Sequence, residues 1–197
     1  MSETEMPDLI AITGRKGHGK DTAAAAFEDY ELVRFADALK KMVYAYLEYV
    51  GVSKETAMRY VDGDMKETPL AIWGGKTTRY VMQTLGTEWG RFIIWDELWI
   101  NAWRMRTAMF EKIVTPDMRF DNEGNVVEKK GGMTLRVVDP RKPFVRGEHP
   151  SEDLVDDLPV QHSVSNNGTI ADLHRKVRLL AQEYRRLSAR ADYNLES

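Results

Sequence analysis

The sequence predicts an α/β fold, with a central, mostly parallel sheet of about five strands flanked by helices. Two observations favour this fold class. Short apolar runs alternate along the chain with longer segments whose apolar residues recur at helical spacing. The first run, residues 9–13 (LIAIT), is continuously apolar, as expected of a strand buried on both faces, and a glycine-rich segment joins it to an alanine-rich one.

The remaining elements follow in order along the chain. After the strand at 9–13, further strands are expected at 31–35, 113–115, 134–138 and 160–164. Helices are expected at 20–30, 37–50, 77–85, 96–111 and 170–190, with a short helix that Ser53 caps. Residues 63–76 are expected to be rich in loops because they contain Pro69 and a glycine pair. The polar stretch 120–132 is expected to be a hairpin-like connection.

Composition excludes several classes of protein. The chain has no cysteine, which rules out disulfides and cysteine-based metal sites. Its net charge is −3, with both signs spread throughout, which disfavours a general nucleic-acid or membrane binder. The acidic start shows no secretory signal, and no apolar run approaches the roughly 18 residues of a membrane span. We therefore expect a cytoplasmic protein with neither a nucleic-acid polymer nor a membrane as partner.

A phosphate-binding loop is the most specific local signal. Gly14, Gly19 and Lys20 have the spacing G-x-x-x-x-G-K between a predicted buried strand and a predicted helix. Glycines let backbone N–H groups approach an anion and adopt positive φ, and the lysine adds a full positive charge beside the outer phosphates. The alternative, a glycine-rich turn with a solvated lysine, is disfavoured by the flanking strand and helix. The bend is therefore predicted to bind a triphosphate.

The residue after the lysine departs from the usual motif. Asp21 stands where serine or threonine is common, and Thr22 follows it. This lysine-x-threonine order resembles nucleoside monophosphate kinases more than GTPases or motor ATPases. We expect Thr22 to contact a phosphate oxygen. Asp21, directly or through water, and Thr22 are the candidate Mg²⁺ ligands.

Further polar clusters offer candidates for binding an acceptor. Residues 34–41 (RFADALKK) lie where the second strand ends, at the ligand-facing rim of such a sheet, although a plain amphipathic helix start is an equal alternative. Arg79 and Gln83 are four residues apart on one helical face. An arginine fork can bind a phosphate and an amide can bind a base edge, but spacing alone favours an exposed polar face. Arg91 follows beyond an expected helix break at Gly86.

Two other patterns have both functional and structural interpretations. Trp95, Trp99 and Trp103 repeat every four residues, which favours core packing over a wall for base stacking. Asp117 and Arg119 end the predicted third strand. They could serve magnesium and a phosphate respectively, or form a salt bridge at the strand end.

Taken together, these segments resemble viral, phage-type deoxynucleoside monophosphate kinases over nearly the whole chain. The matching segments occur in the same order: GRKGHGKDT, FADALK, R-x-x-x-Q-x-L-G-T, a downstream tryptophan, D-x-R-x-x-x-E, GGMTLRVVDP, H-x-S-E and SNNGTIADL. Two positions differ from the usual pattern. Asn166, Asn167 and Gly168 stand where Asn-Asp-Gly is usual, and Ala38 replaces a common proline.

The resemblance implies a P-loop kinase fold and transfer of the γ-phosphate of ATP, with Mg²⁺, to deoxynucleoside 5′-monophosphates. The products would be deoxynucleoside diphosphates for DNA synthesis, and relatives of this kind suggest a homodimer. The implied catalytic residues are Lys20, Arg79, Arg119 and Arg141. Those implied for ATP are Gly14, Arg15, Lys16, Gly17, Gly19, Lys20, Asp21 and Thr22. Those implied for the acceptor are Phe35, Asp37, Lys40, Arg79, Gln83, Arg91, Trp99, Arg119 and Glu123.

We expect one domain, residues 1–197, with a substrate-binding helical part at about 37–112 and a lid at about 141–158. The lid segment is charged and has no clear period, so it is expected to be mobile until both nucleotides bind, with Arg141 contacting phosphate. A solvated surface loop is the equal alternative. Other functions also stay open: another small-molecule P-loop kinase, such as a dephospho-coenzyme A kinase, or a nucleotide switch. The four histidines are scattered and suggest no competing catalytic triad or metal site.

Overall fold

The computed structural model describes residues 5–142 and 154–195. The chain divides into two compact units. The sheet unit comprises Met1–Arg34 and Thr107–Ser197, and the helical unit comprises Phe35–Arg106. The range expected for a substrate-binding helical part, about 37–112, overlaps the helical unit, and its role stays a prediction.

The sheet unit is built on five parallel strands. They are β1 (Leu9–Thr13), β2 (Glu31–Leu32), β5 (Ile113–Thr115), β6 (Met133–Val138) and β7 (His162–Ser165). Their order is β2-β5-β1-β6-β7, and each neighbouring pair runs parallel. The predicted α/β class with a mostly parallel sheet is therefore confirmed. The central strand β1 is buried along its whole length, as its continuous apolar sequence predicts.

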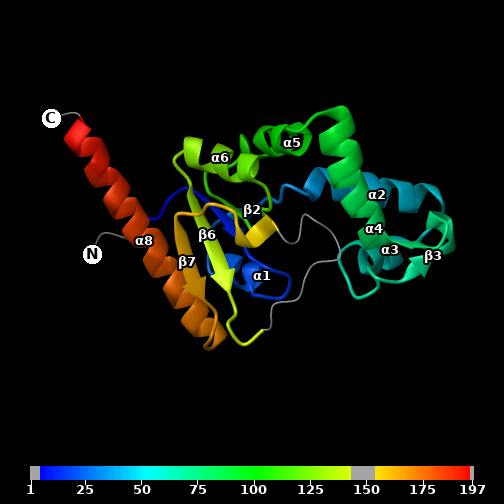
Figure 1. Ribbon diagram of the computed structural model, residues 1–197, viewed down its shortest axis with the longest axis horizontal. Coiled ribbons are helices and arrows are strands. Elements are labelled where there is room, and N and C mark those ends of the chain that lie inside the picture. The colour runs from blue at the N-terminus through cyan, green and yellow to red at the C-terminus, as the bar shows by residue number, and fades with distance from the viewer. Residues whose placement is uncertain (1–4, 143–153, 196–197) are drawn as a thin grey trace. The chain divides into compact units, whose positions relative to one another are not determined.

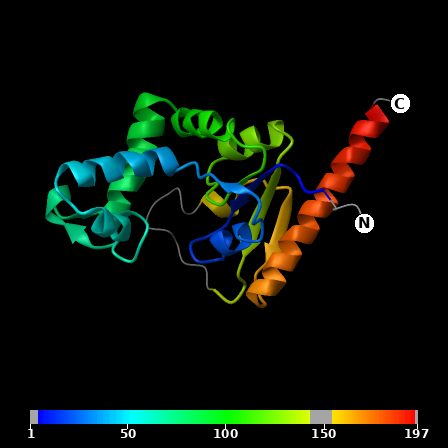
Figure 2. The same ribbon diagram turned by 180° about the vertical axis from the view of Figure 1, so that it is seen from behind.

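Helices cover both faces of this sheet. Helices α1 (Lys20–Ala24) and α8 (Ile170–Leu195) pack on one face, where Ile10 and Ile12 join Leu173 and Val177 in one core. In Figures 1 and 2, α8 is the long orange-to-red helix that runs along β7. Helix α6 (Asp121–Lys129) packs against the opposite face. A short 3₁₀ helix, η3 (Leu154–Asp156), completes the described elements of this unit.

The helical unit, all of whose residues are described, contains six helical segments and a small hairpin. They are α2 (Asp37–Tyr49), α3 (Lys54–Val61), β3 (Pro69–Leu70), the 3₁₀ turn η1 (Ala71–Trp73), β4 (Lys76–Thr77), α4 (Thr78–Thr84), the π-helix η2 (Leu85–Ile94) and α5 (Leu98–Thr107). Val43, Leu47, Ala57 and Val61 form the core between α2 and α3. Ser53 caps α3 as predicted, since its Oγ accepts a hydrogen bond from the Thr56 N–H at 3.2 Å.

Several expected elements differ from the structure. The hairpin expected at 120–132 is wrong, because Asp121–Lys129 is helix α6. The strands on either side of it, β5 and β6, both pair parallel to β1, and a parallel connection needs a crossover, whereas a hairpin reverses the chain. The break expected at Gly86 is also wrong, since helical backbone continues through it as η2.

Other differences concern bounds. The first helix ends at Ala24 and the second strand at Leu32, both earlier than expected, and the loop expected at 63–76 contains β3, η1 and the start of β4. Most of the expected lid, residues 143–153, lies outside the described residues. Within the described residues, no helix is both long and apolar enough to cross a membrane.

Candidate active site

The loop from Gly14 to Lys20 follows the end of β1 and needs its glycines for two reasons. Gly14, Gly17 and Gly19 have φ values of 137°, 78° and 99°, which side chains disfavour. Gly14 also lies against β6, since a Cβ there would fall 2.4 Å from the carbonyl oxygen of Val137. Any side chain at this position would force the loop away from the sheet. The loop therefore keeps its bend only with glycine at these positions.

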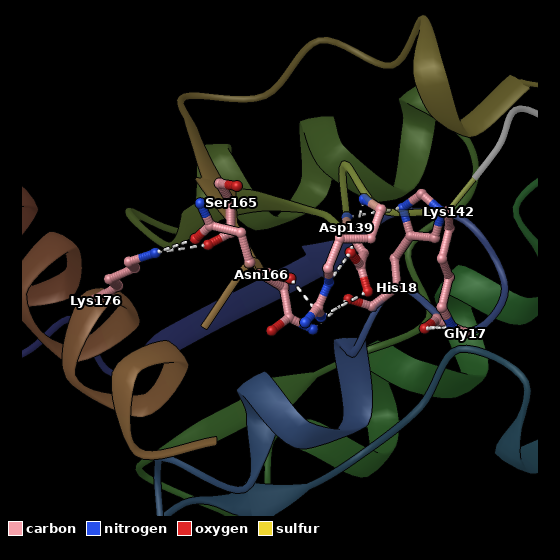
Figure 3. A network of polar contacts seen from close by, with 9 residues as sticks. Gly17, His18, Asp139, Lys142, Ser165, Asn166 and Lys176 are labelled. Atoms are coloured by element: carbon pink, nitrogen blue, oxygen red, sulfur yellow. Dashed lines mark hydrogen bonds and ion pairs between the residues drawn. The ribbon is translucent and has the colours of Figure 1, made fainter. Parts of the chain in front are cut away.

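Three side chains donate hydrogen bonds to backbone carbonyl groups of this loop. Lys20 Nζ donates to the carbonyl oxygen of Arg15 at 2.9 Å, across the bend. Lys142 Nζ donates to the carbonyl oxygen of Gly17, and Asn166 Nδ2 donates to that of His18 at 3.0 Å. Figure 3 shows Lys142 and Asn166 reaching the loop from outside it. Because C=O and N–H point in opposite directions in a trans peptide, groups that hold the carbonyls also orient the N–H groups that a phosphate would need.

Asp139, the residue after β6, is hydrogen-bonded to the same loop. His18 is buried, and its Nδ1 accepts from the backbone N–H of Asp139 at 3.2 Å. The Asp139 carboxylate accepts three hydrogen bonds from Arg141, two of them from the guanidinium at 2.8 and 3.0 Å. The hydrogen bonds from Arg141 lower the pKa of Asp139 to about 2. Burial, and then the nearby Lys20 ammonium, hold the pKa of His18 below 6.5, so the neutral ring is favoured.

The network around Asp139 went unrecognised in the sequence. The site predicted from the sequence does not include His18, Asp139 and Lys142, and Asn166 is named only within the segment that differs from the usual Asn-Asp-Gly pattern. A usable signal was present, because D-P-R-K directly follows a predicted strand and so lies at the carboxyl edge of the sheet, where ligands bind in such folds. Arg141, expected to contact phosphate, pairs here with Asp139 and also donates to the carbonyl oxygen of Asn166.

The remaining loop residues make contacts with the rest of the sheet unit. Arg15 pairs with Asp156 at 2.5 Å, and Lys16 is exposed. Asp21 pairs with Arg34 at 2.7 Å, and the carbonyl oxygen of Thr22 accepts from His174 Nε2 at 2.8 Å.

The donor set at the start of α1 fits a magnesium ion that keeps most of its water. Mg²⁺ is commonly bound through one or two oxygen ligands from the protein plus substrate phosphates and waters. The Asp21 carboxylate is exposed and the Thr22 side chain is half-buried, which suits that mode of binding. Within the described residues, no group of three or more histidine, aspartate and glutamate side chains could form a complete cage.

Glu123, in the first turn of α6, holds the backbone of the segment that follows β5. Its buried carboxylate accepts from the backbone N–H groups of Arg119 and Phe120 at 2.7 and 3.3 Å. This contact caps the start of α6 and fixes the backbone of Arg119. Asp117 and the Arg119 side chain are half-buried in the same segment. The D-x-R-x-x-x-E pattern is therefore a single local unit, in which the glutamate positions the arginine.

In the helical unit, Arg79 and Lys40 both have acidic neighbours. Arg79, near the start of α4, pairs through Nε with Glu67. Lys40 pairs with Asp62 at 2.7 Å, and the Tyr44 hydroxyl donates to the same carboxylate at 2.8 Å.

These contacts shift the pKa values of two of the groups. Burial, aided by the Asp62 carboxylate, raises the pKa of Tyr44 to about 12. Burial also acts to raise the pKa of Asp62, but the hydrogen bonds from Lys40 and Tyr44 outweigh it, so that pKa lies below 3.8.

The other acceptor candidates differ in exposure. Asp37, in the first turn of α2, and Gln83, one turn along α4 from Arg79, are half-buried. Phe35 is buried, and its ring lies 4.8 Å from that of Trp103. Arg91 is 4% exposed and donates to the backbone carbonyl of Asp96 at 3.0 Å.

The tryptophan repeat packs mainly into the core of the helical unit, as its spacing favoured. Trp99 and Trp103 are buried, whereas Trp95 is half exposed. The Nε1 of Trp99 donates to the carbonyl oxygen of Gly86 at 2.7 Å, and its ring lies against Gly90. These contacts give Trp99 a packing role, and its assignment to the acceptor stays a prediction.

The expected site residues thus fall into two groups, one in each unit. The sheet unit holds the loop candidates from Gly14 to Thr22 with Arg119, Glu123 and Arg141. The helical unit holds Phe35, Asp37, Lys40, Arg79, Gln83, Arg91 and Trp99. The first group is suited to bind a polyphosphate. The second contains cations and an amide, and its two aromatic residues, Phe35 and Trp99, are buried.

Comparison with known proteins gives one relative of high coverage. A protein of Acanthamoeba polyphaga mimivirus, described as "Putative deoxynucleotide monophosphate kinase", is 30% identical over 189 residues, covering 86% of this chain and 93% of the viral protein. No family model matches the chain.

Similar solved structures include three distant ones. TT1252 from Thermus thermophilus has a TM-score of 0.45 at 19% identity and covers 91% of this chain and 98% of its own. A gluconokinase from Sinorhizobium meliloti 1021 has a TM-score of 0.45 at 14% identity, covering 96% and 98%. A dephospho-CoA kinase from Campylobacter jejuni has a TM-score of 0.43 at 11% identity, covering 90% and 97%. Likenesses of this level do not indicate what this chain binds.

Proposed function

This chain belongs to the family of deoxynucleotide monophosphate kinases, and we propose that it transfers the γ-phosphate of ATP to a deoxynucleoside 5′-monophosphate. The product would be the corresponding deoxynucleoside diphosphate. The observation that carries the proposal is the loop from Gly14 to Lys20. It leaves a fully buried central strand with three glycines at positive φ and a lysine side chain drawn across its bend. The mimiviral relative supports the choice of a nucleotide acceptor.

The loop is proposed to bind the donor phosphates. Its backbone N–H groups would bind phosphate oxygens, and Lys20 would move from the Arg15 carbonyl to the β and γ phosphates. Phosphoryl transfer requires positioning and charge neutralisation more than it requires an acid or base. A rigid loop with a lysine supplies both. Arg119 and Arg141 are proposed to add positive charge at the transferring group, and Glu123 holds the backbone of Arg119 in place.

Magnesium is proposed to be held by Asp21 and Thr22 at the start of α1. When bound, the ion supplies charge neutralisation at the phosphate oxygens. Arg34 pairs with Asp21 and keeps its carboxylate beside the loop until a cation arrives.

The helical unit is proposed to bind the acceptor. Arg79 is a suitable partner for the monophosphate because a guanidinium can donate two parallel hydrogen bonds, and Glu67 restrains its side chain through Nε. Gln83 is proposed to bind the base edge from the next turn of α4. Lys40 and Asp37, near the start of α2, are further polar groups of this proposed acceptor site.

A phosphate-transfer screen tests this function directly. ATP and Mg²⁺ would be incubated with the protein and each common ribo- and deoxynucleoside monophosphate, with dephospho-coenzyme A and a no-acceptor sample in parallel. The proposal expects a diphosphate product with at least one deoxynucleoside monophosphate. Product with dephospho-coenzyme A alone would identify a different kinase. ATP hydrolysis that no acceptor changes would instead indicate a nucleotide switch.

A further inference from the structure

We propose that Asn166 is a positioning residue for the triphosphate-binding loop, acting through the carbonyl oxygen of His18. This inference rests on the proposed function, because it assigns a task toward the same donor site. Asn166 follows β7 at the carboxyl edge of the sheet and is 148 residues from His18 in sequence. Its side chain nevertheless reaches the carbonyl oxygen of His18 in the loop (Figure 3).

The contact has only one chemically sensible orientation. The carbonyl oxygen of His18 can only accept, so the amide nitrogen of Asn166 must face it, and the two atoms are 3.0 Å apart. The described residues contain no cis peptide bond, so the N–H of Gly19 points away from the carbonyl that Asn166 holds. Asn166 therefore sets the direction of the Gly19 N–H, at the point where the loop enters α1.

Gly19 makes this approach possible. A Cβ on Gly19 would lie 2.5 Å from the Asn166 amide nitrogen, so the Asn166 side chain would have to move away from the loop. The residue also has φ of 99°, in the left-handed region. The second glycine of the motif is thus required by its own backbone conformation and by the amide that packs on it.

Asn166 is itself held firmly. Its N–H donates to the carbonyl oxygen of Val138 at 2.7 Å, and its own carbonyl accepts from Arg141 at 3.0 Å. Arg141 is in turn fixed by Asp139 through two guanidinium contacts. A side chain anchored on a sheet edge can keep a loop in its binding geometry, which lowers the ordering cost when an anion binds.

The neighbouring Asn167 provides a matched control. Its Oδ1 accepts from Lys176 Nζ at 2.9 Å, and Asn167 makes no contact with the loop among those described. Asn166→Asp keeps the shape of the side chain, removes the donor and adds a negative charge. Asn167→Asp adds the same charge one residue away and keeps an oxygen for Lys176. Asn166→Ala removes the donor without adding charge.

The experiment measures binding by calorimetry with three ligands and Mg²⁺: a non-hydrolysable ATP analogue, inorganic tripolyphosphate and a deoxynucleoside monophosphate. We expect both Asn166 variants to bind the ATP analogue and tripolyphosphate about tenfold more weakly, the loss that a well-placed hydrogen bond gives. Binding of the monophosphate should not change, and Asn167→Asp should match the wild type for all three ligands.

Three results would overturn the inference. Weaker binding of the ATP analogue with unchanged tripolyphosphate binding would mean that Asn166 serves the nucleoside. Weaker binding in Asn166→Asp but not in Asn166→Ala would mean that the added negative charge, and not the lost amide donor, weakens binding. Equal losses with all three ligands would indicate general destabilisation. If the wild-type protein bound neither the ATP analogue nor tripolyphosphate, the proposed function itself would be refuted.

Discussion

Replacing Lys20 by methionine separates the loop's role in catalysis from its role in folding. Methionine keeps most of the aliphatic stem and removes the ammonium. In the structure that ammonium donates a hydrogen bond, 2.9 Å long, to the Arg15 carbonyl at a partly buried position. Losing one such contact costs at most about 1–3 kcal/mol, less than the roughly 5–15 kcal/mol that stabilises a typical domain. The variant should therefore fold.

The catalytic effect should be larger. A preorganised positive group at a developing charge contributes about 3–4 kcal/mol to transition-state stabilisation, which corresponds to a loss of 10²–10³-fold in turnover. Turnover would be measured at saturating ATP and acceptor, alongside the thermal midpoint. Lys130→Met, at the exposed C-terminal end of α6, makes the same charge change outside the loop and should retain full activity. A folded Lys20→Met variant with turnover within tenfold of the wild type would refute the role of the loop.

Three further predictions concern the acceptor, the core and pH. Arg79→Ala should reduce kcat/KM for monophosphates by roughly 2–4 kcal/mol, whereas Gln83→Ala should mainly reorder the preferred bases; identical behaviour toward every substrate would contradict this division. Gly90→Ala should lower the free energy of unfolding, measured in urea, by about 1–3 kcal/mol, because a Cβ there would lie 2.5 Å from Trp99 Nε1. An unchanged free energy of unfolding would mean that the Trp99 ring can move away at no cost. Because the pKa of His18 lies below 6.5 in the folded state, its share of stability is present above pH 6.5 and is lost as pH falls through the folded pKa. His18→Gln cannot titrate, so its free energy of unfolding should lack that part of the decline at low pH. If the variant showed the same dependence of stability on pH as the wild type, His18 would not be the cause of the decline.

The parts of the site that could be predicted are those that local sequence determines. The loop was recognised because glycine spacing, a buried strand before it and a helix after it all lie within Leu9–Ala24. Burial of Trp99 and Trp103 followed from helical periodicity in the same way. In each case the physical cause lies within a few residues of its effect.

The parts that could not be predicted depend on contacts between distant residues. His18 meets Asp139 across 121 positions and Asn166 across 148, and no local pattern encodes either contact. The hairpin predicted in place of helix α6 is wrong for a related reason. Its polar, asparagine- and glycine-bearing sequence is typical of a turn, whereas the parallel pairing of its two flanking strands with β1 makes a crossover necessary.

Transfer of a labelled γ-phosphate tests the central claim most directly. The protein would be incubated with γ-labelled ATP, Mg²⁺ and a mixture of deoxynucleoside monophosphates, and the label would be followed by chromatography. The proposed function predicts labelled deoxynucleoside diphosphate formed in equal amount to ADP, and almost none with Lys20→Met. Label found only as free phosphate, or a labelled diphosphate that Lys20→Met forms equally well, would contradict it.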